Sequence, residues 1–467
     1  LFFLCFIYNF EKKKTVCFIT GWLFGFGYFI SNIYWIINSL TFEEIFKPLI
    51  PIALFIIPLF LGLFYGLATY VCSFFKLAKD YSSVLLFALL ISIFEYFRGV
   101  ILGGFPWNLT AYSWTYYLDF LQILKLIGTY SFNLITITLF LMPTAFFFKK
   151  GLKSKIILSF SILFFVGINF YYGKYVINRN YSAQNVKLES KIKIVSPRIE
   201  IDRFFKSEDV SKIINDLIKL SDPKPESTIF IFPEGIITDI FLENIDVHQK
   251  LFSDNFSKKH KIILGINSFE NSKIYNSMAV LDNNLNILAK YNKNKLVPFG
   301  EYLPFEKFFK KIGLKKITQG YTSFSSSNDR NIINIDDIKF LPLICYEIIY
   351  SGELKKSEEE FDLIINISED GWFGNSIGPY QHFSHSVFRA IEEGKNLIRS
   401  TNGGISAYID PYGNIIKKIK STEKGVIEVK SYKKTEETFF SLHGNKIFFY
   451  FVIFYISLIF FIKRKGR

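Results

Sequence analysis

Long apolar segments separated by short lysine clusters fill the first 175 residues of the chain, and one more lies near its end. The complete segments come close to the ~20 apolar residues with which an α-helix crosses a bilayer. The chain begins inside an apolar run without an initiator methionine, so we expect a clipped first span and further sequence upstream. The predicted spans are Leu1–Tyr8, Thr15–Leu40, Pro48–Phe75, Ser82–Phe97, Leu118–Phe148, Ile156–Tyr172 and Ile447–Ile462.

The polar region after the sixth apolar segment has a different pattern. Short apolar runs rich in β-branched residues recur there, with polar or helical segments between them. This alternation is typical of an α/β domain in which helices cover mixed sheets. Asp410–Asn414 (DPYGN) has the composition of a turn between two strands. The predicted strands are Lys193–Val195, Thr228–Phe232, Ile262–Ile266, Ser277–Leu281, Ile338–Cys345, Asp362–Ile367 and Ile405–Ile409.

The charge distribution predicts an orientation in the membrane. The formal net charge is +14, and the lysines cluster beside the apolar segments, where they suit anionic lipid headgroups better than a nucleic acid. The positive-inside rule places the basic clusters at 12–14, 76–79, 149–155 and 463–467 on the cytoplasmic side, and the number of predicted spans between them agrees. The polar region from about Gly173 to Asn445 then faces outward, which in a bacterium is the periplasmic side of the inner membrane.

Two features of the predicted membrane region leave alternatives open. Glu95 and Arg98 lie at helical spacing near the end of a span; they either snorkel to the membrane surface or, as intramembrane charges often do, serve a function. The loop Gly99–Tyr117 suits an aromatic belt at headgroup level, with a substrate contact as the alternative. Gly21 and Gly25 have the small-xxx-small spacing of closely packed helices.

Polar residues follow several predicted strands of the outward region. A carboxylate, a lysine and a thiol supply the base, the oxyanion stabiliser and the nucleophile for acyl transfer through a thioester. Taken singly, Glu234 is explained as an acid at a helix N-terminus, Lys293 as a solvated lysine, and Cys345 as a small buried hydrophobe. The other cysteines lie in apolar segments, so neither a disulfide framework nor a metal site is expected. The residues in question are Glu234, Lys293, Lys295, Glu301, Cys345, Tyr346 and Glu347.

Three motifs around these residues resemble those of a known family. F-P-E-G at 232–235, Y-N-K-x-x-L-V-P-F-G-E at 291–301 and I-C-Y-E at 344–347 are similar to the Glu, Lys and Cys motifs of the nitrilase superfamily. The similarity is closer to its membrane branch, the apolipoprotein N-acyltransferases, and extends to 97–108, 366–382 and 389–404. It implies a multi-span helical bundle at 1–175, an outward-facing αββα nitrilase-like domain at 185–432, and a C-terminal span with a basic tail at 443–467.

The resemblance also implies residue roles. Glu234 would be the general base, Cys345 the nucleophile, and Lys293, which lies eight residues before Glu301 as in the family, the oxyanion stabiliser rather than Lys295. Ser196 and Arg198 replace two amides of the family pattern, and Phe204 or Phe205 takes the place of a tryptophan. Further positions important in the family are matched by Glu301, Tyr346 and Glu347.

The implied reaction moves an acyl chain from a phospholipid, through a cysteine thioester, to the α-amine of a diacylglyceryl apolipoprotein. No cofactor is needed, and the family implies a monomer. A membrane-tethered amidase that hydrolyses an amide with water is the alternative, and a non-enzymatic lipid-binding protein is a third reading. The segment Pro304–Lys316 has the pattern of a basic interfacial helix or of a helix packed on the domain. The predicted lipid contacts are Phe308, Phe309, Trp372 and Phe373.

Two other patterns indicate different chemistry. Gly374–Gly378 (GNSIG) matches the nucleophile elbow of serine hydrolases, but Pro379 follows it and the flanking residues do not predict a strand, a turn and a helix. His382 and His385 suggest a metal site, yet no companion ligands cluster near them in the sequence. We therefore expect no catalytic role for Ser376 and a structural role for both histidines.

Overall fold

The computed structural model describes residues 6, 13–75, 77, 79–148, 151–179, 184–205, 209–304, 323–355 and 359–465. Within them, six helical segments are long and apolar enough to cross a membrane, which confirms six predicted spans. The predicted span Leu1–Tyr8 lies outside the described residues apart from Phe6. The six segments are Lys14–Leu40, Glu44–Cys72, Tyr81–Val100, Leu124–Phe147, Leu152–Arg179 and Lys446–Arg464.

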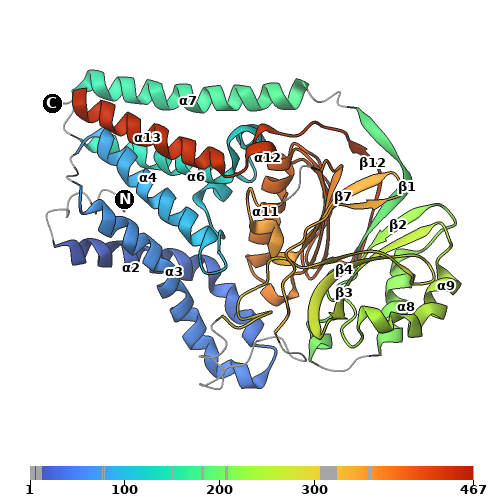
Figure 1. Ribbon diagram of the computed structural model, residues 1–467. Helices are drawn as coiled ribbons and strands as arrows, with labels where there is room; N and C mark the ends of the chain where they lie inside the picture. The colour runs from blue at the N-terminus through green and yellow to red at the C-terminus, as the bar shows by residue number, and fades with distance from the viewer. Residues whose placement is uncertain are drawn as a thin grey trace.

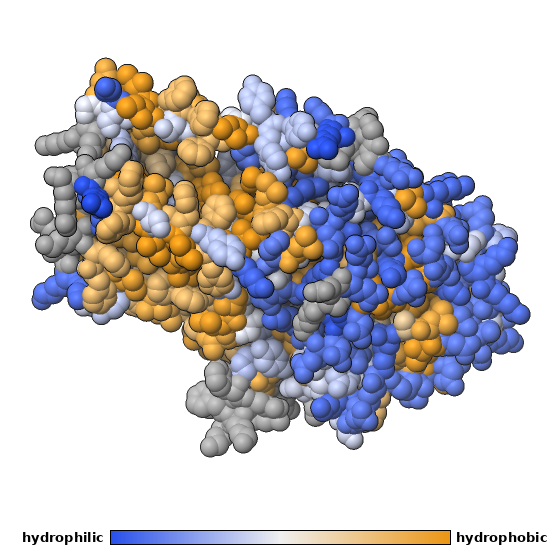
Figure 2. All heavy atoms as spheres, turned by 45° about the horizontal axis from the view of Figure 1, so that its top comes forward, coloured by the Kyte–Doolittle hydropathy of each residue, from blue (hydrophilic) through white to orange (hydrophobic). Residues whose placement is uncertain are grey.

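The bundle helices pack around α4 (Tyr81–Val100), most of which is buried. Gly25 and Gly62 bring α2 and α3 together, since a Cβ added to Gly25 would lie 2.8 Å from the Gly62 Cα, as the small-xxx-small spacing predicts. The lipid-facing side of the bundle forms the apolar surface in Figure 2. The elements are α2 (Lys14–Ile33), η1 (Tyr34–Leu40), η2 (Glu44–Leu49), α3 (Ile50–Cys72), α4, η3 (Thr110–Trp114), α5 (Leu118–Leu121), α6 (Leu124–Leu141), η4 (Met142–Phe147), α7 (Leu152–Arg179) and α13 (Lys446–Lys465).

Two six-stranded sheets form the other part of the chain. Their strand orders are β12-β1-β2-β3-β4-β5 and β11-β10-β9-β8-β7-β6. In each sheet three central strands are parallel, β1 to β3 and β7 to β9, and the outer pairs are antiparallel. The strands are β1 (Asn185–Ser196), β2 (Thr228–Ile231), β3 (His260–Glu270), β4 (Lys273–Leu281), β5 (Ile287–Asn292), β6 (Ile333–Ile335), β7 (Ile338–Ile344), β8 (Leu363–Glu369), β9 (Asn396–Asn402), β10 (Ser406–Ile409), β11 (Ile415–Ile419) and β12 (Gly425–Lys433).

Helices cover the outer face of each sheet, so the domain is the expected αββα sandwich. Isoleucines from both sheets fill the core between them. The first sheet packs against α8 (Val210–Ser221) and α9 (Gln249–Asn255). The second packs against α11 (Gly378–Glu393), which shares one hydrophobic core with the bundle helices. Figure 1 shows α11 between the bundle and the sheets. The C-terminal end of β7 also lies close to the membrane helices, because Tyr346, two residues after β7, donates a hydrogen bond to the Gly104 carbonyl beyond α4.

The intramembrane charges are buried rather than snorkelling. Glu95 and Arg98 are each 1% exposed. The Glu95 carboxylate accepts hydrogen bonds from Tyr65 and Asn133, both at 2.6 Å. Arg98 donates to the backbone carbonyls of the 99–117 loop, including that of Trp107 at 2.8 Å. Trp107 is 1% exposed, so the aromatic-belt interpretation is wrong for this residue, which packs inside the protein.

Candidate active site

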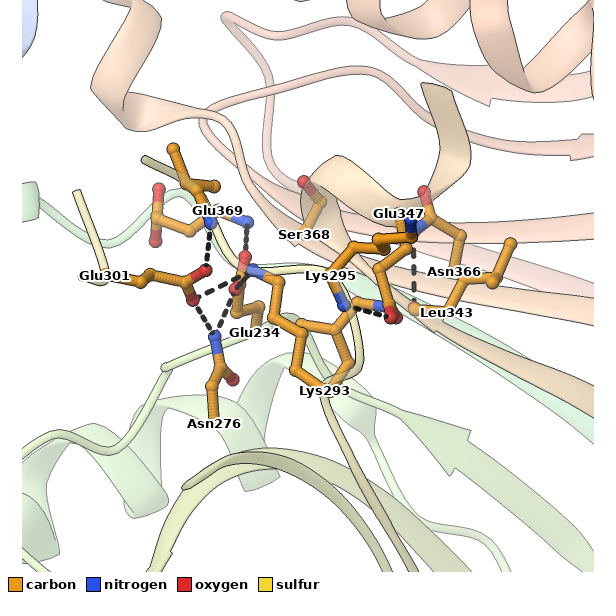
Figure 3. Close-up of polar contacts among 12 residues, drawn as sticks. Glu234, Asn276, Lys293, Lys295, Glu301, Leu343, Glu347, Asn366, Ser368 and Glu369 are labelled. Carbon is orange, nitrogen blue, oxygen red and sulfur yellow. Dashed lines mark hydrogen bonds and ion pairs between the residues drawn. The ribbon is translucent and has the colours of Figure 1, made fainter. Parts of the chain in front are cut away.

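The Lys293 ammonium group lies between two carboxylates at the strand ends (Figure 3). Glu234 follows β2, while Lys293 and Glu301 follow β5. The Lys293 Nζ atom is 3.2 Å from Oε1 of Glu234 and 2.9 Å from Oε1 of Glu301. Asn276, on β4, donates through Nδ2 to both oxygens at 2.7 Å. None of the four residues is more than 7% exposed, so the charges of Glu234, Lys293 and Glu301 interact with little screening by water.

Cys345 joins this group from the other sheet. It is the first residue after β7, and its φ of 49° lies in the left-handed region, which residues with a Cβ seldom adopt and which concentrates at functional sites. Burial raises the pKa of the Cys345 thiol well above its usual value, and Glu234 raises it further, whereas Lys293 and a hydrogen bond with Ser368 lower it. The thiol is therefore protonated at rest and lies within electrostatic range of the Glu234 carboxylate and the Lys293 ammonium group.

Of the two candidate lysines, the structure places only Lys293 with the carboxylates. Burial alone lowers its pKa, but Glu234 and Glu301 raise the pKa well above the ordinary value, so Lys293 stays cationic. Lys295 instead forms an ion pair with Glu353, with Nζ 2.8 Å from Oε2, and its side chain is 37% exposed.

Glu347 ties the cysteine turn to the lysine turn. Its Oε2 atom accepts from Ile344 N at 2.8 Å, immediately before Cys345, and its Oε1 atom accepts from the backbone amides of Asn294 and Lys295 at 2.9 and 3.1 Å. Although burial opposes ionisation, Arg330 and Tyr291 help to lower the Glu347 pKa below its usual value. The same oxygen accepts from Arg330 Nη2 at 2.7 Å and Tyr291 Oη at 2.6 Å.

Tyr346 connects the site to the membrane bundle. Its hydroxyl donates to the Gly104 carbonyl at 2.8 Å, and the Tyr350 hydroxyl donates to the Gly103 carbonyl at 2.7 Å. The loop that accepts these bonds follows α4 and is held by Arg98. A side chain adjacent to the cysteine is thus fixed by a segment more than 200 residues earlier in the chain.

Sequence reasoning missed the residues that hold Glu234 from behind. The Glu234 Oε2 atom accepts from Glu369 N at 2.9 Å, and the Glu369 side chain forms an ion pair with the buried Arg203. Asn402 donates to Glu369 Oε2 at 2.9 Å. These partners come from distant segments of the chain, and their polar side chains follow no periodic pattern. The sequence around each of them therefore does not predict a contact with Glu234; only the position of Glu369 and Asn402 at the ends of strands could have suggested it.

The aromatic candidates form a cluster next to the site. Trp372, in η8 (Gly371–Phe373), lies with its ring centroid 5.1 Å from that of Phe204 and 6.0 Å from that of Phe205. Phe373 packs on Trp35 of η1, with centroids 4.7 Å apart. The predicted contacts Phe308 and Phe309, and most of Pro304–Lys316, lie outside the described residues.

The two positions that depart from the family pattern contact the protein's own backbone. Ser196 Oγ donates to the Thr401 carbonyl at 3.2 Å. The Arg198 guanidinium donates to the Thr422 carbonyl. Both side chains therefore hold neighbouring segments of the sheet domain in place.

The competing motifs have local partners in the structure. Ser376 Oγ donates to the Phe373 carbonyl at 2.8 Å and accepts from Gly378 N at 3.0 Å, at the start of α11. His382 Nδ1 lies 2.9 Å from Asp370 Oδ1, and His385 packs on the Tyr112 ring with centroids 4.2 Å apart. Among the described residues, no group of three or more His, Cys, Asp or Glu side chains is arranged to hold a metal ion.

Comparison with known proteins assigns the helical bundle and the sheet domain each to a protein family. The family "Apolipoprotein N-acyltransferase N-terminal domain" matches residues 1–142 and the family "Carbon-nitrogen hydrolase" matches residues 206–434. An apolipoprotein N-acyltransferase of Rickettsia prowazekii is 33% identical over 98% of this chain and 92% of its own length. One from Rhizobium rhizogenes is 31% identical over 90% of this chain and 81% of its own. Among solved structures, Saccharomyces cerevisiae Nit3 of the nitrilase superfamily is 16% identical over 56% of this chain and 96% of its own, with a TM-score of 0.39.

The sheet domain is thus of the carbon-nitrogen hydrolase class, as the motifs at its strand ends indicated. Relatives that are about one third identical extend through the helical bundle as well as the sheets. The chain therefore belongs to the apolipoprotein N-acyltransferase family, which confirms the resemblance drawn from its motifs.

Proposed function

We propose that this chain transfers an acyl group from a phospholipid to the α-amine of the N-terminal diacylglyceryl-cysteine of an apolipoprotein. The observation that carries the proposal is the buried contact of Lys293 with Glu234 and Glu301, next to the left-handed Cys345 turn. The relatives named for this activity supply the substrate class.

The first half-reaction loads the cysteine. Because its thiol is protonated at rest, Cys345 needs a base, and Glu234 removes the proton. The thiolate attacks the ester carbonyl, and Lys293 stabilises the oxyanion that forms. When the intermediate collapses, the bond to the glycerol oxygen breaks, and that oxygen takes the proton from Glu234. The products are a lysophospholipid and a thioester on Cys345.

The second half-reaction makes the amide. The free α-amine attacks the thioester carbonyl, Lys293 again stabilises the oxyanion, and Glu234 takes a proton from the nitrogen. The carbon–sulfur bond then breaks, and the sulfur recovers that proton as the Cys345 thiol. Glu301 accompanies Lys293 as a second carboxylate, so the ammonium remains charged while Glu234 is protonated. A thioester is higher in energy than an amide, so no nucleotide is consumed.

The packing of α11 supports a site at the membrane surface. This helix shares one core with the bundle on one side and covers the second sheet on the other, and the Tyr346 bond to Gly104 keeps the end of β7 beside the loop that follows α4. In Figure 1 the C-terminal end of α13 lies on the side of the bundle away from the sheets, which supports a cytoplasmic C-terminal basic tail and a periplasmic sheet domain at a bacterial inner membrane. One copy of the chain supplies every residue of the scheme, as a monomeric enzyme requires.

Product analysis tests the proposal. Purified protein is incubated with a phospholipid that carries a labelled acyl chain and with a synthetic diacylglyceryl-cysteine peptide. We expect label in an N-acylated peptide with wild-type protein and none with Cys345→Ser. Label recovered as free fatty acid, with the peptide unmodified, would show a hydrolase instead.

A further inference from the structure

The periplasmic end of α4 exposes apolar side chains that the proposed chemistry does not use. Of the residues of α4, all of which the structure describes, only Phe97 and Val100 are exposed, at 43% and 36%. The exposed surface continues through Ile101 and Leu102, at 44% and 62%. A helix that is otherwise packed inside the bundle therefore opens to its surroundings only in its last turn.

A second exposed side chain lies on the sheet domain beside this turn. Phe299 is 42% exposed and stands in the short turn between Lys293 and Tyr302. The turn is closed by hydrogen bonds from Phe299 N to Tyr302 O at 2.7 Å and from Val297 N to Glu301 Oε2 at 2.8 Å. The carboxylate that contacts Lys293 thus also fixes the turn that presents Phe299.

The two exposed segments meet next to the site. A Cβ added to Gly103 would lie 3.1 Å from the Tyr302 hydroxyl and 3.6 Å from the Pro298 ring. The carbonyls of Gly103 and Gly104 accept the hydroxyls of Tyr350 and Tyr346. The exposed side chains at the end of α4 are therefore connected to the neighbour of Cys345 through Gly104 and Tyr346, and Phe299 lies two residues before Glu301 in the sequence. We name this surface the apolar rim: Phe97, Val100, Ile101, Leu102 and Phe299.

The backbone at the rim is unusual. Leu102 and Phe299 have φ of 55° and 64°, in the left-handed region where the Cβ of a bulky residue is crowded by its own backbone. Such conformations persist where the surrounding structure enforces them and concentrate at functional sites. Here each places a large apolar side chain outward from a tight turn beside the catalytic group.

We propose that the apolar rim is where the acyl chains of a membrane phospholipid pass from the bilayer to Cys345. The inference rests on the proposed function and commits to a lipid as the occupant. The reason is continuity: the rim joins the exposed last turn of a membrane-spanning helix to the turn that follows Lys293, and it has no charged side chain among its members. Exposed apolar surface of this kind marks a membrane or ligand contact.

The test separates passage of lipid from chemistry. The full chain is placed in bilayer discs of a diether phospholipid, which has no ester to attack. Acylation of Cys345 is followed by mass spectrometry with two donors: dipalmitoylphosphatidylethanolamine within the bilayer and water-soluble dibutyrylphosphatidylethanolamine. The variants are Leu102→Asn and Phe299→Asn, because asparagine tolerates left-handed backbone. Val247→Asn, at a 70% exposed position of η6 (Leu242–His248), is the matched control.

Both rim variants are expected to slow acylation of Cys345 by the bilayer donor about tenfold, because loss of one apolar side-chain contact changes a rate by about this factor. With the soluble donor, both variants should stay within about twofold of the wild-type rate. Val247→Asn should match wild type with both donors. An equal loss with both donors, or no loss with the bilayer donor, would overturn the role of the rim. If wild-type protein accepts no acyl group from either donor, the proposed function fails instead.

Discussion

Replacing Glu347 by Gln is expected to lower the free energy of unfolding by about 4–6 kcal/mol at neutral pH, although the side chain keeps its shape. The native carboxylate accepts from Arg330 Nη2 at 2.7 Å, and both side chains are almost completely buried. Leaving one charge of such a pair without its partner costs about 3–5 kcal/mol. The amide of glutamine also turns an N–H toward a backbone N–H, either that of Ile344 or those of Asn294 and Lys295, which adds about 1 kcal/mol.

The pH dependence of this contribution has a definite sign. The folded state lowers the Glu347 pKa, chiefly through Arg330 against the opposing effect of burial. A carboxylate of this kind stabilises the fold at pH values above its unfolded pKa of ~4.3, and the stabilisation is lost as the pH falls through the folded value. The difference between wild type and Glu347→Gln should therefore be full at pH 7 and shrink below about pH 4.

Equilibrium unfolding of the detergent-solubilised protein measures the effect, with Arg330→Met and the double variant completing a mutant cycle. Because the two side chains share one buried pair, the double variant should be at least about 2 kcal/mol more stable than additivity predicts. The same variants should acylate Cys345 slowly, since Glu347 holds the backbone on both sides of the site. This interpretation of the Glu347–Arg330 pair would be refuted if Glu347→Gln lowered the free energy of unfolding by less than about 1 kcal/mol. It would also be refuted if the effects of the two single substitutions simply added in the double variant.

Three further substitutions test separate parts of the account. Lys293→Met should reduce the rate of Cys345 acylation about 10²–10³-fold, because it removes the ammonium group that we propose stabilises the oxyanion. Lys295→Met should stay within about twofold of the wild-type rate, because the native Lys295 ammonium pairs with Glu353. Similar rates for both variants would remove Lys293 from the mechanism. Ser376→Ala should leave the rate of Cys345 acylation within about threefold of wild type. It should cost about 1 kcal/mol of stability, because Ser376 Oγ accepts from Gly378 N at the start of α11. Complete loss of activity in a folded Ser376→Ala variant would support the serine-hydrolase alternative. Gly128→Ala should destabilise the protein by more than about 2 kcal/mol, because Gly128 has φ of 69° and an added Cβ would lie 1.9 Å from the Phe440 ring. Gly27→Ala is the control, because no atom lies within 4 Å of its new Cβ. In thermal unfolding this control should be close to neutral.

The elements that periodicity could predict are those with a strong apolar pattern. Six membrane spans and the strands β2, β3, β4, β7 and β8 coincide with mainly apolar runs of the sequence. The strand β9 (Asn396–Asn402) was missed because its sequence NLIRSTN is mostly polar, although every residue in it is buried. Several of its polar side chains have partners elsewhere; the Arg399 Nη2 atom, for example, donates to Asp370 Oδ2 at 2.8 Å. A hydrophobic pattern does not mark a buried strand of this kind.

Some residues of the candidate site could likewise be predicted from the sequence, and others could not. Glu234, Lys293 and Cys345 follow predicted or observed strands, so strand ends and motifs were enough to single them out. Two buried arginines pair with the carboxylates behind the site: Arg203 with Glu369 and Arg330 with Glu347. Arg203 lies in a short 3-10 helix, η5 (Ile201–Phe204), and Arg330 in a segment without regular secondary structure. Only the folded arrangement shows that they are buried and paired. The snorkelling alternative for Glu95 and Arg98 was wrong for the same reason, since their buried partners come from other helices and a loop.

The most direct test of the account is a mass measurement on the Cys345 peptide. Protein incubated with a phospholipid but no acceptor should gain one acyl group on this peptide, in a linkage that neutral hydroxylamine cleaves, and should lose it when a diacylglyceryl-cysteine peptide is added. Glu234→Gln should acquire the acyl group far more slowly. An acyl group found on another residue, or an N-acylated product formed by Cys345→Ala protein at the wild-type rate, would contradict the transfer of the acyl chain through the Cys345 sulfur.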